Sequence, residues 1–276
     1  MNAPTCLQVW VEGIGLLAPG LPDWPRAAAV LTGQTPYEAA PTVLPAPELL
    51  PAAERRRASR IIKAALAAGL QACRHAGRDP ALLASVFASS GGDGHNCHAI
   101  CEQLAAGDRQ ISPTRFHNSV HNAASGYWSI ATGATAASQA LSAYDASFAA
   151  GLLEAITQVA ATGQPLLLVA ADCEYPQPLH ATRPIADTGA LALVLTPQRT
   201  PASLGRLALP CRGALADGAP TPLAAGLPAP LRGLAQTMPP MRGLPLLAAL
   251  ARLPQEDTVA LEWFAPQALH VQVRCA

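Results

Sequence analysis

The chain has 276 residues, enough for one large domain or two modest ones with a sizeable buried core. Half of its residues are hydrophobic and only 13% are charged, well below the usual quarter, so its surface carries few charges. Eighteen basic residues balance eighteen acidic ones, which argues against nucleic acid or an anionic membrane as a partner, since both attract clustered positive charge.

The sparse charge has two explanations. A surface with few charges suits a protein that hides a large face against a partner, while high-GC coding bias would also enrich Ala, Pro, Gly and Arg. Seven cysteines without a framework spacing indicate free thiols in a reducing compartment. No basic residue precedes Arg26, and no apolar run is long enough for a signal peptide or a membrane span, so we expect a cytoplasmic protein.

Strands and helices alternate through the first part of the chain. The hydrophobic pattern predicts a strand at 7–15, a helix at 24–32 closed by Gly33, a proline-rich connection at 36–51, a helix at 53–76 ended by Gly77, a strand at 83–90 and a helix at 95–106. The basic run Arg55-Arg56-Arg57 falls in the first turns of the helix at 53–76. It is either a solvated helix face or a docking patch for an acidic carrier protein or another partner.

The middle of the chain contains the most apolar segments. The pattern predicts a strand at 138–144, a helix at 146–162, and strands at 165–171 and 188–195. Strands that are apolar on both faces and separated by helices imply a central sheet covered on both sides, so the fold class is α/β.

The composition changes after Pro197. Residues 197–254 are rich in Pro, Gly, Leu and Ala, with a weak strand signal at 204–209. Two strands at 258–264 and 268–274, separated by Pro266, predict a hairpin. We therefore expect residues 198–276 to be a reduced C-terminal half that completes one domain with residues 1–197.

The turn Tyr144-Asp145-Ala146-Ser147 joins a predicted strand to a helix of small residues. A sharp turn of this kind is the geometry of a nucleophile elbow. It presents one side chain at a helix N-terminus, where the helix dipole can lower the pKa of a thiol.

The order of these segments resembles the N-terminal half of the β-ketoacyl synthases, which have a thiolase-like layered α/β/α fold. In that family an Asn- and Gly-containing helix precedes the strand that ends at the nucleophilic cysteine, as the run SVHNAASGYWSIATG at 119–133 precedes the predicted strand here. The run LVAADCE at 168–174 is similar to the apolar strand that follows in the family. The run RPIADTGALALVL at 183–195 resembles a shortened form of the family's RPFD…GEGAGALVL segment. The resemblance extends over residues 7–197.

The chain differs from the family at the positions of the catalytic cysteine and histidines. Tyr144 stands at the position of the nucleophilic cysteine, and a one-residue shift would place Asp145 there. Beyond Tyr144 the histidines are His180 and His270, and neither has the sequence context of the family's two catalytic histidines. No residue is therefore assigned a catalytic role, because condensation needs a nucleophile and a base.

The resemblance implies a chain-length-factor-like subunit that pairs with an active ketosynthase and shapes the tunnel for a carrier-protein-bound chain. The run at 119–133 is more similar to the compact ketosynthase-like subunits of aryl-polyene (xanthomonadin-type) clusters than to fatty-acid synthases. We expect the tunnel and the subunit interface to involve a set of polar and aromatic side chains: His117, Asn118, His121, Asn122, Tyr127, Trp128, Tyr144 and Asp145. The phenol of Tyr144 is expected to block or bound a vestigial pocket.

Two other functions stay open. The chain would be an acyltransferase, a ketoacyl synthase or a hydrolase if Ser142, Ser147 or Cys173 served as the nucleophile. Alternatively, it would be a homodimeric protein that sequesters acyl chains.

No metal or cofactor is expected. Cys97 and Cys101 lie four residues apart, but a closed zinc site needs a second ligand pair. His117 and His121 share a helix face if one helix spans them, yet no acid stands beside them as in HExxH. The run SSGGDG at 89–94 lacks the lysine of a phosphate-binding loop, so a turn before a helix, with Asp93 near its start, is favoured. Tyr127 and Trp128 fit either the core or a subunit interface.

Overall fold

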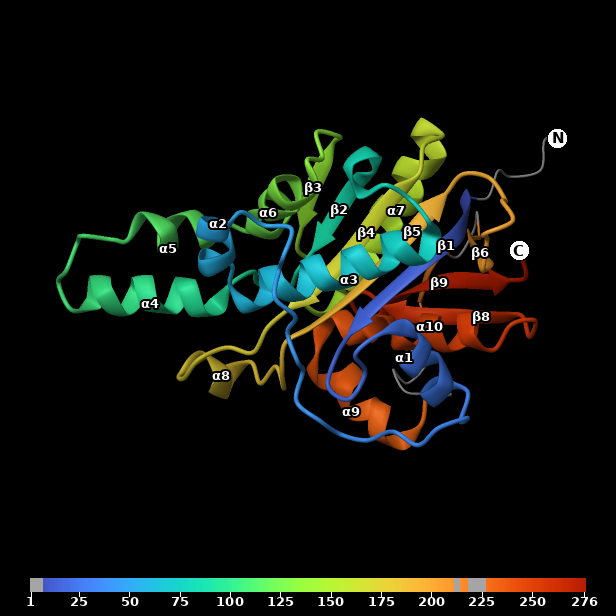
Figure 1. Cartoon of the computed structure of the whole chain (residues 1–276). Coiled ribbons are helices and arrows are strands. Elements are labelled where there is room, and N and C mark those ends of the chain that lie inside the picture. Colours follow the sequence, from blue (N-terminus) through green and yellow to red (C-terminus); the bar gives the residue numbers. More distant parts are fainter. Residues whose placement is uncertain (1–6, 211–213, 218–226) are drawn as a thin grey trace.

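A computed structural model describes residues 7–210, 214–217 and 227–276. Nine strands of these residues form one sheet in the order β3-β2-β4-β5-β1-β6-β9-β7, with β8 paired to β9 (Figure 1). The strands are β1 (Leu7–Leu17), β2 (Ala84–Ala88), β3 (Ser138–Leu141), β4 (Leu166–Asp172), β5 (Gly189–Thr196), β6 (Gly205–Leu209), β7 (Leu215–Asp217), β8 (Asp257–Glu262) and β9 (Gln267–Arg274). β2 is parallel to β3 and β4, while β5 is antiparallel to β4 and β1.

Helices cover both faces of this sheet, as the apolar strands predict (Figure 1). Alternate residues of β4 and β5 belong to different hydrophobic clusters, one on each face. The first face is covered by α3 (Arg60–Ala76) and α6 (Ala123–Thr132). The second is covered by α7 (Ser147–Thr162), α1 (Trp24–Leu31), α9 (Ala229–Thr237) and α10 (Leu244–Ala251).

The contact of α3 with β1 depends on two glycines of the strand. A Cβ atom on Gly15 would lie 1.9 Å from the carbonyl oxygen of Ala68, and one on Gly13 would lie 2.1 Å from that of Ala72. Only glycine allows this approach, so the Gly-Ile-Gly sequence of β1 fixes α3 against the middle of the sheet.

The helix predicted at 53–76 is wrong as a single element. The structure has α2 (Ala52–Arg57) and α3, separated by Ala58 and Ser59, whose backbones are extended. The break directs the Arg60 side chain to two acids from a distant part of the chain: its Nε lies 2.6 Å from Glu174 and its Nη2 lies 3.3 Å from Asp187. The proline-rich residues 36–51, here called the strap, run without helix or strand from α1 to α2 (Figure 1).

The C-terminal part contains helices that the sequence pattern did not indicate. α9, the 3₁₀ helix η3 (Pro239–Gly243) and α10 occupy the Pro- and Gly-rich region. The predicted hairpin is confirmed, because β8 and β9 pair antiparallel on either side of Pro266.

A helical arm projects from the sheet (Figure 1). It consists of α4 (Gly94–Ala105), which was predicted at 95–106 and has Asp93 as its N-cap, and α5 (Pro113–Asn118), which lies beside it. The remaining short helices are η1 (Pro80–Leu82), η2 (Tyr144–Ala146) and α8 (Leu179–Thr182). In the part of the chain that is described, no helix combines the length and the apolar character needed to cross a bilayer.

Candidate functional site

The turn between β3 and α7 has the geometry of an elbow. Tyr144 has a φ of 53°, and it is the one non-glycine residue with positive φ within the described ranges. The hydroxyl of Ser147, which is buried, donates to the carbonyl oxygen of Tyr144 at 2.7 Å and accepts from the amide of Ala143 at 3.0 Å. These two hydrogen bonds hold Tyr144 in a left-handed conformation that a tyrosine rarely adopts.

The Tyr144 side chain points away from the core. It is 57% exposed, and the guanidinium carbon of Arg183 lies 3.7 Å from the centre of its ring. This is a cation–π contact at the surface. The phenol therefore lies at the edge of a pocket and does not fill its interior.

Two arginines and two acids surround the turn. Asp145 accepts from Arg183 at 2.8 Å and from Arg242 at 3.1 Å, and Arg242 also pairs with Glu262. Burial alone would lower the pKa of Arg183, but its hydrogen bond and charge interaction with Asp145 raise it. Burial lowers the pKa of Arg242, against the opposite effect of Asp145. The network ties the elbow to η3 and β8 of the C-terminal part.

A pocket of about 210 Å³ opens beside this network. Its lining includes Tyr144, Arg183, Thr237 and Arg242. No histidine of the described chain lines it, and the one carboxylate of its lining, Asp145, is paired with Arg183 and Arg242. His180 lies on α8 and His270 on β9.

Two of the three alternative nucleophiles have their hydroxyls in hydrogen bonds, and the third is a buried thiol. The Ser147 hydroxyl is engaged in the elbow, and the Ser142 hydroxyl donates to the carbonyl oxygen of Ser90 at 3.1 Å. Burial, together with the nearby acids Asp93 and Asp172, raises the pKa of the Cys173 thiol, which keeps it protonated.

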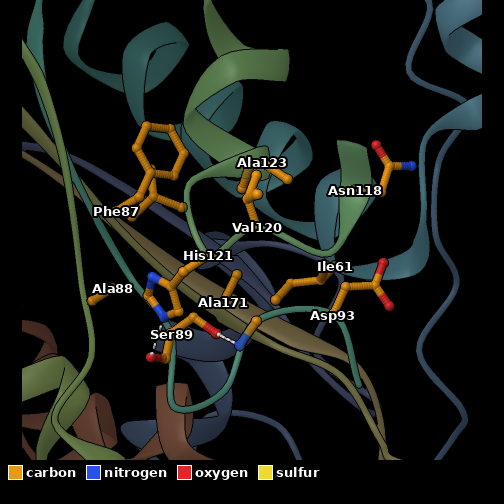
Figure 2. A pocket seen from close by; sticks show the side chains of 13 residues that line it. Ile61, Phe87, Ala88, Ser89, Asp93, Asn118, Val120, His121, Ala123 and Ala171 are labelled. Carbon is orange, nitrogen blue, oxygen red and sulfur yellow. Dashed lines mark hydrogen bonds between the residues drawn. The ribbon is translucent and has the colours of Figure 1, made fainter. Parts of the chain in front are cut away.

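A second pocket lies between the sheet and the segment that links α5 to α6 (Figure 2). Phe87 and Ala171 contribute from the strands and Ile61 from α3, while Asn118 at the end of α5 and His121 in the linking segment close it. The Nε2 atom of His121 lies 3.1 Å from the carbonyl oxygen of Ser89, so this nitrogen carries the hydrogen. The enclosed space is small and mostly apolar.

A buried carboxyl group organises the loop beside this pocket. Asp172, at the end of β4, accepts from the Ser89 hydroxyl at 3.0 Å and from the Ser90 hydroxyl at 2.8 Å and the Ser90 amide at 3.0 Å. The Asp93 carboxylate accepts from the Asn96 amide at the start of α4, as expected for a helix cap. The run at 89–94 is therefore a turn held by the Asp172 carboxyl group and by the helix cap at Asp93.

The structure brings three of the predicted tunnel and interface residues together, because the His117 ring packs edge-on against the Tyr127 ring at 6.0 Å and its Nδ1 atom lies 3.1 Å from the Oδ1 atom of Asn118. His117 is in α5 and His121 is in the turn before α6, so no single helix spans them. Asn118 is buried and donates to the carbonyl oxygen of Arg57 at 2.9 Å, while Asn122 is exposed at the start of α6.

Tyr127 and Trp128 lie in the core of the first face. Tyr127 is 0% exposed and Trp128 is 1% exposed, and the Trp128 ring lies directly over Gly69 of α3. Of the two interpretations of this pair, the structure supports core packing, because neither ring reaches a surface that a partner would contact.

No group of three metal-ligating side chains occurs among the described residues. The five cysteines within this part of the chain are free, and Cys6 and Cys211 fall outside it. The network of Arg183, Arg242 and Glu262 was missed by sequence reasoning. Arg183 begins the RPIAD run that carried the family resemblance, whereas no motif marks Arg242.

Comparisons with known proteins agree with this architecture. Residues 24–217 match the model of the β-ketoacyl synthase N-terminal domain. No protein with a curated description matches the sequence.

Solved structures of similar fold include ketosynthases in complex with partner proteins. A chain from a ketosynthase in complex with its chain length factor, from Xenorhabdus doucetiae, is 23% identical with a TM-score of 0.69 over 96% of this chain and 99% of that chain. The ishigamide ketosynthase/chain length factor is 14% identical, with a TM-score of 0.69 over 98% of this chain and 99% of that one. A ketosynthase bound to a hexaketide, in complex with its type II acyl-carrier protein, is 13% identical, with a TM-score of 0.70 over 99% and 100%. At these identities the likeness concerns the fold, and it confirms the predicted thiolase-like α/β class.

Proposed function

The chain belongs to the β-ketoacyl synthase family, and from this membership we propose that it is a non-catalytic, chain-length-factor-like subunit that pairs with an active ketosynthase. Together the two subunits would extend a chain that is carried on an acyl carrier protein. The proposed product class is the aryl polyenes, on the resemblance of residues 119–133.

The observation that carries the proposal is the state of the elbow. The backbone at residue 144 keeps the strained conformation that displays a nucleophile, yet the side chain displayed is a phenol stacked on Arg183. A phenol hydroxyl is a weaker nucleophile than a cysteine thiolate, and the pocket beside it is lined by no histidine of the described residues, while its carboxylate, Asp145, is paired with two arginines. The geometry supports a subunit that keeps the backbone conformation of the elbow but has no nucleophilic cysteine there.

Exposed apolar side chains support a protein partner. Leu104 and Phe116 on the arm, Val120 after it and Ile130 on α6 are all exposed by 44% or more. They lie on the arm, after it and on α6, which contacts β3 at one edge of the sheet. An exposed apolar surface and an open strand edge are features that proteins usually cover with a partner.

The pocket in Figure 2 is the proposed place where this subunit would bound the acyl tunnel. It lies under Val120, between the exposed apolar side chains and the sheet. In this proposal Asn118 and His121 fix the wall of the tunnel, while His117 and Asn122 lie nearer the partner. We also propose a cytoplasmic location, in keeping with the free cysteines.

The experiment is co-expression with a ketosynthase encoded in the same gene neighbourhood. We expect a stable one-to-one complex by size-exclusion chromatography with light scattering. After incubation with an acyl-loaded carrier protein, intact mass spectrometry should find the acyl adduct on the ketosynthase alone.

The ketosynthase is the internal control, because its own adduct shows that the acyl donor is active. An acyl adduct on the present chain would contradict the non-catalytic role, and Ser142→Ala, Ser147→Ala and Cys173→Ala would then locate it. A monomer that binds none of the neighbouring ketosynthases would contradict the partner role.

A further inference from the structure

A groove lies between the strap and α3, on the face of the sheet opposite to α7. Its volume is about 560 Å³, within the range of small-molecule sites. Most of its lining is apolar and comes from both walls: Pro47, Leu49, Leu50, Leu66, Leu70 and Ala131.

The outer wall of the groove is held in place by hydrogen bonds. The Nη2 atom of Arg55 donates to the carbonyl oxygens of Glu48 at 2.9 Å and Leu50 at 3.2 Å. The amide of Thr42 donates to Asp187 at 2.8 Å, and Leu50 is buried. The strap is thus fixed at both ends of the groove, so the cavity exists before any ligand enters.

Two cations stand at the ends of the apolar floor. Lys63 and Arg74 lie eleven residues apart on the same side of α3, which is about 16 Å along a helix. Neither side chain makes an ion pair or a hydrogen bond with any residue in the described ranges. Glu48 supplies the one carboxylate of the lining, and no ion pair joins it to either cation.

We infer that this groove binds an unbranched acyl carboxylate, with the carboxylate at Arg74 and the chain along Leu70 and Leu66 toward the strap. The planar guanidinium of arginine matches a carboxylate with two hydrogen bonds, which an ammonium group does not. A neutral ligand would leave Arg74 without a partner, and a small polar acid would leave the apolar floor exposed. The inference does not depend on the proposed subunit role, because the groove is separate from the elbow and from the pocket in Figure 2.

The test is isothermal titration calorimetry of the full chain with decanoate below its micelle concentration. Decan-1-ol and decyltrimethylammonium serve as the neutral and cationic counterparts. We expect decanoate to bind more tightly than either counterpart.

Variants of the groove supply the structural test. Ala67, half-buried in the floor, becomes a plug in Ala67→Trp, which should weaken decanoate at least about tenfold by occupying the space of several methylene groups. Arg74→Gln should weaken it about threefold, the usual size of an exposed charge contact. Leu70→Glu, which adds a negative charge to the same floor, should weaken it as well and provides a second variant if Ala67→Trp folds poorly.

Two matched variants separate this groove from other sites. Arg56→Gln removes an exposed arginine of α2 outside the groove and should leave the affinity unchanged. Val120→Trp fills the entrance of the pocket in Figure 2 and should also leave it unchanged. The inference is overturned if Val120→Trp weakens decanoate while Ala67→Trp and Leu70→Glu do not, or if the three ligands bind equally well.

Discussion

At the scale of single residues, Asp172 is a carboxyl group that is 2% exposed at the end of a buried strand. Burial raises its pKa to about 6, against the opposing effects of its hydrogen bonds from Ser90 and Ser89 and of the charge of Arg183. The folded chain therefore retains a proton that the unfolded chain releases near pH 4. The stability that this proton contributes is present below pH 4 and is lost as the pH rises through about 6.

We predict that Asp172→Asn removes this pH dependence. Between pH 4 and pH 7 the free energy of unfolding of the wild type should fall by about 2 to 3 kcal/mol relative to that of the variant. Urea unfolding at four pH values measures the difference. Asp257→Asn, at an exposed carboxylate at the start of β8, is the control and should follow the wild type. Parallel curves for wild type and Asp172→Asn would show that Asp172 titrates normally.

Tyr144 is a second residue in an unusual state, and here the backbone is the strained part. At a φ of 53° any side chain with a Cβ atom costs roughly 1 kcal/mol more than glycine. The elbow hydrogen bonds of Ser147 hold this conformation whatever the side chain is.

We predict that Tyr144→Gly unfolds with a free energy about 1 kcal/mol higher than that of Tyr144→Ala. Both variants lose the contact with Arg183, so the comparison isolates the backbone. At the exposed neighbour Ser142, whose φ is negative, the order should reverse, because glycine there only adds freedom to the unfolded chain. Thermal unfolding of the four variants provides the values. An alanine variant at position 144 as stable as the glycine variant would mean that the elbow relaxes.

At the scale of elements, the break between α2 and α3 shows how a local pattern can hide a tertiary feature. Ser59 has a φ of −76° and a ψ of 174°, and its hydroxyl finds no hydrogen-bond partner among the described residues. Ala58 before it is extended, which is the conformation required of a residue that precedes proline.

Ser59→Pro should accordingly be tolerated, with a free energy of unfolding within about 1 kcal/mol of the wild type. In one continuous helix the same change would cost about 3 kcal/mol. Lys63→Pro is the matched control, because it deletes the hydrogen bond from the Lys63 amide to the carbonyl oxygen of Ser59, at 3.0 Å, inside α3. Chemical unfolding monitored by circular dichroism measures both. Equal losses for the two variants would contradict the break.

The elements that could be predicted are those whose signal is local. β4 and β5 are apolar on both faces because both faces are covered, and the elbow follows from a strand, a sharp turn and small residues. The break at Ser59 could not be predicted, because apolar residues keep their helical spacing across it. The break places Arg60 beside Glu174 and Asp187, more than a hundred residues away, and no local pattern records such a contact.

The helices of the C-terminal part were hidden by their prolines. In α9, η3 and α10 the prolines stand in the first positions, where a helix has no hydrogen bond to lose, so a proline-rich composition is compatible with helix. The Asp145–Arg242 ion pair was missed for another reason, because its two residues lie far apart in the sequence. The site beside the elbow is built from contacts that no local pattern records.

At the scale of the whole molecule, the C-terminal strands extend the sheet that the N-terminal residues begin. β6 pairs with β1, and β9 pairs with β6. Arg242 joins Asp145 of the elbow to Glu262 of β8. We propose on these contacts that residues 1–197 and 198–276 form one domain. In this domain the C-terminal part holds the elbow through the ion pair of Arg242 with Asp145.

The exposed apolar side chains of the molecule allow a matched test of the partner surface. Phe116 on the arm is 63% exposed, and Phe264, in the turn between β8 and β9, is 57% exposed. The two residues have the same chemistry and similar exposure, but they lie in different regions of the structure. Aromatic side chains at the centre of an interface often account for much of its binding energy.

We predict that Phe116→Lys weakens the complex with the neighbouring ketosynthase at least about tenfold, whereas Phe264→Lys leaves it unchanged. Surface plasmon resonance on the immobilised ketosynthase measures both affinities, and thermal unfolding should show that each variant is folded, since neither side chain is buried. The reverse order would move the partner to the β8–β9 end of the sheet. Such a result would retain the subunit role but remove the arm, and with it the pocket under Val120, from the proposed tunnel.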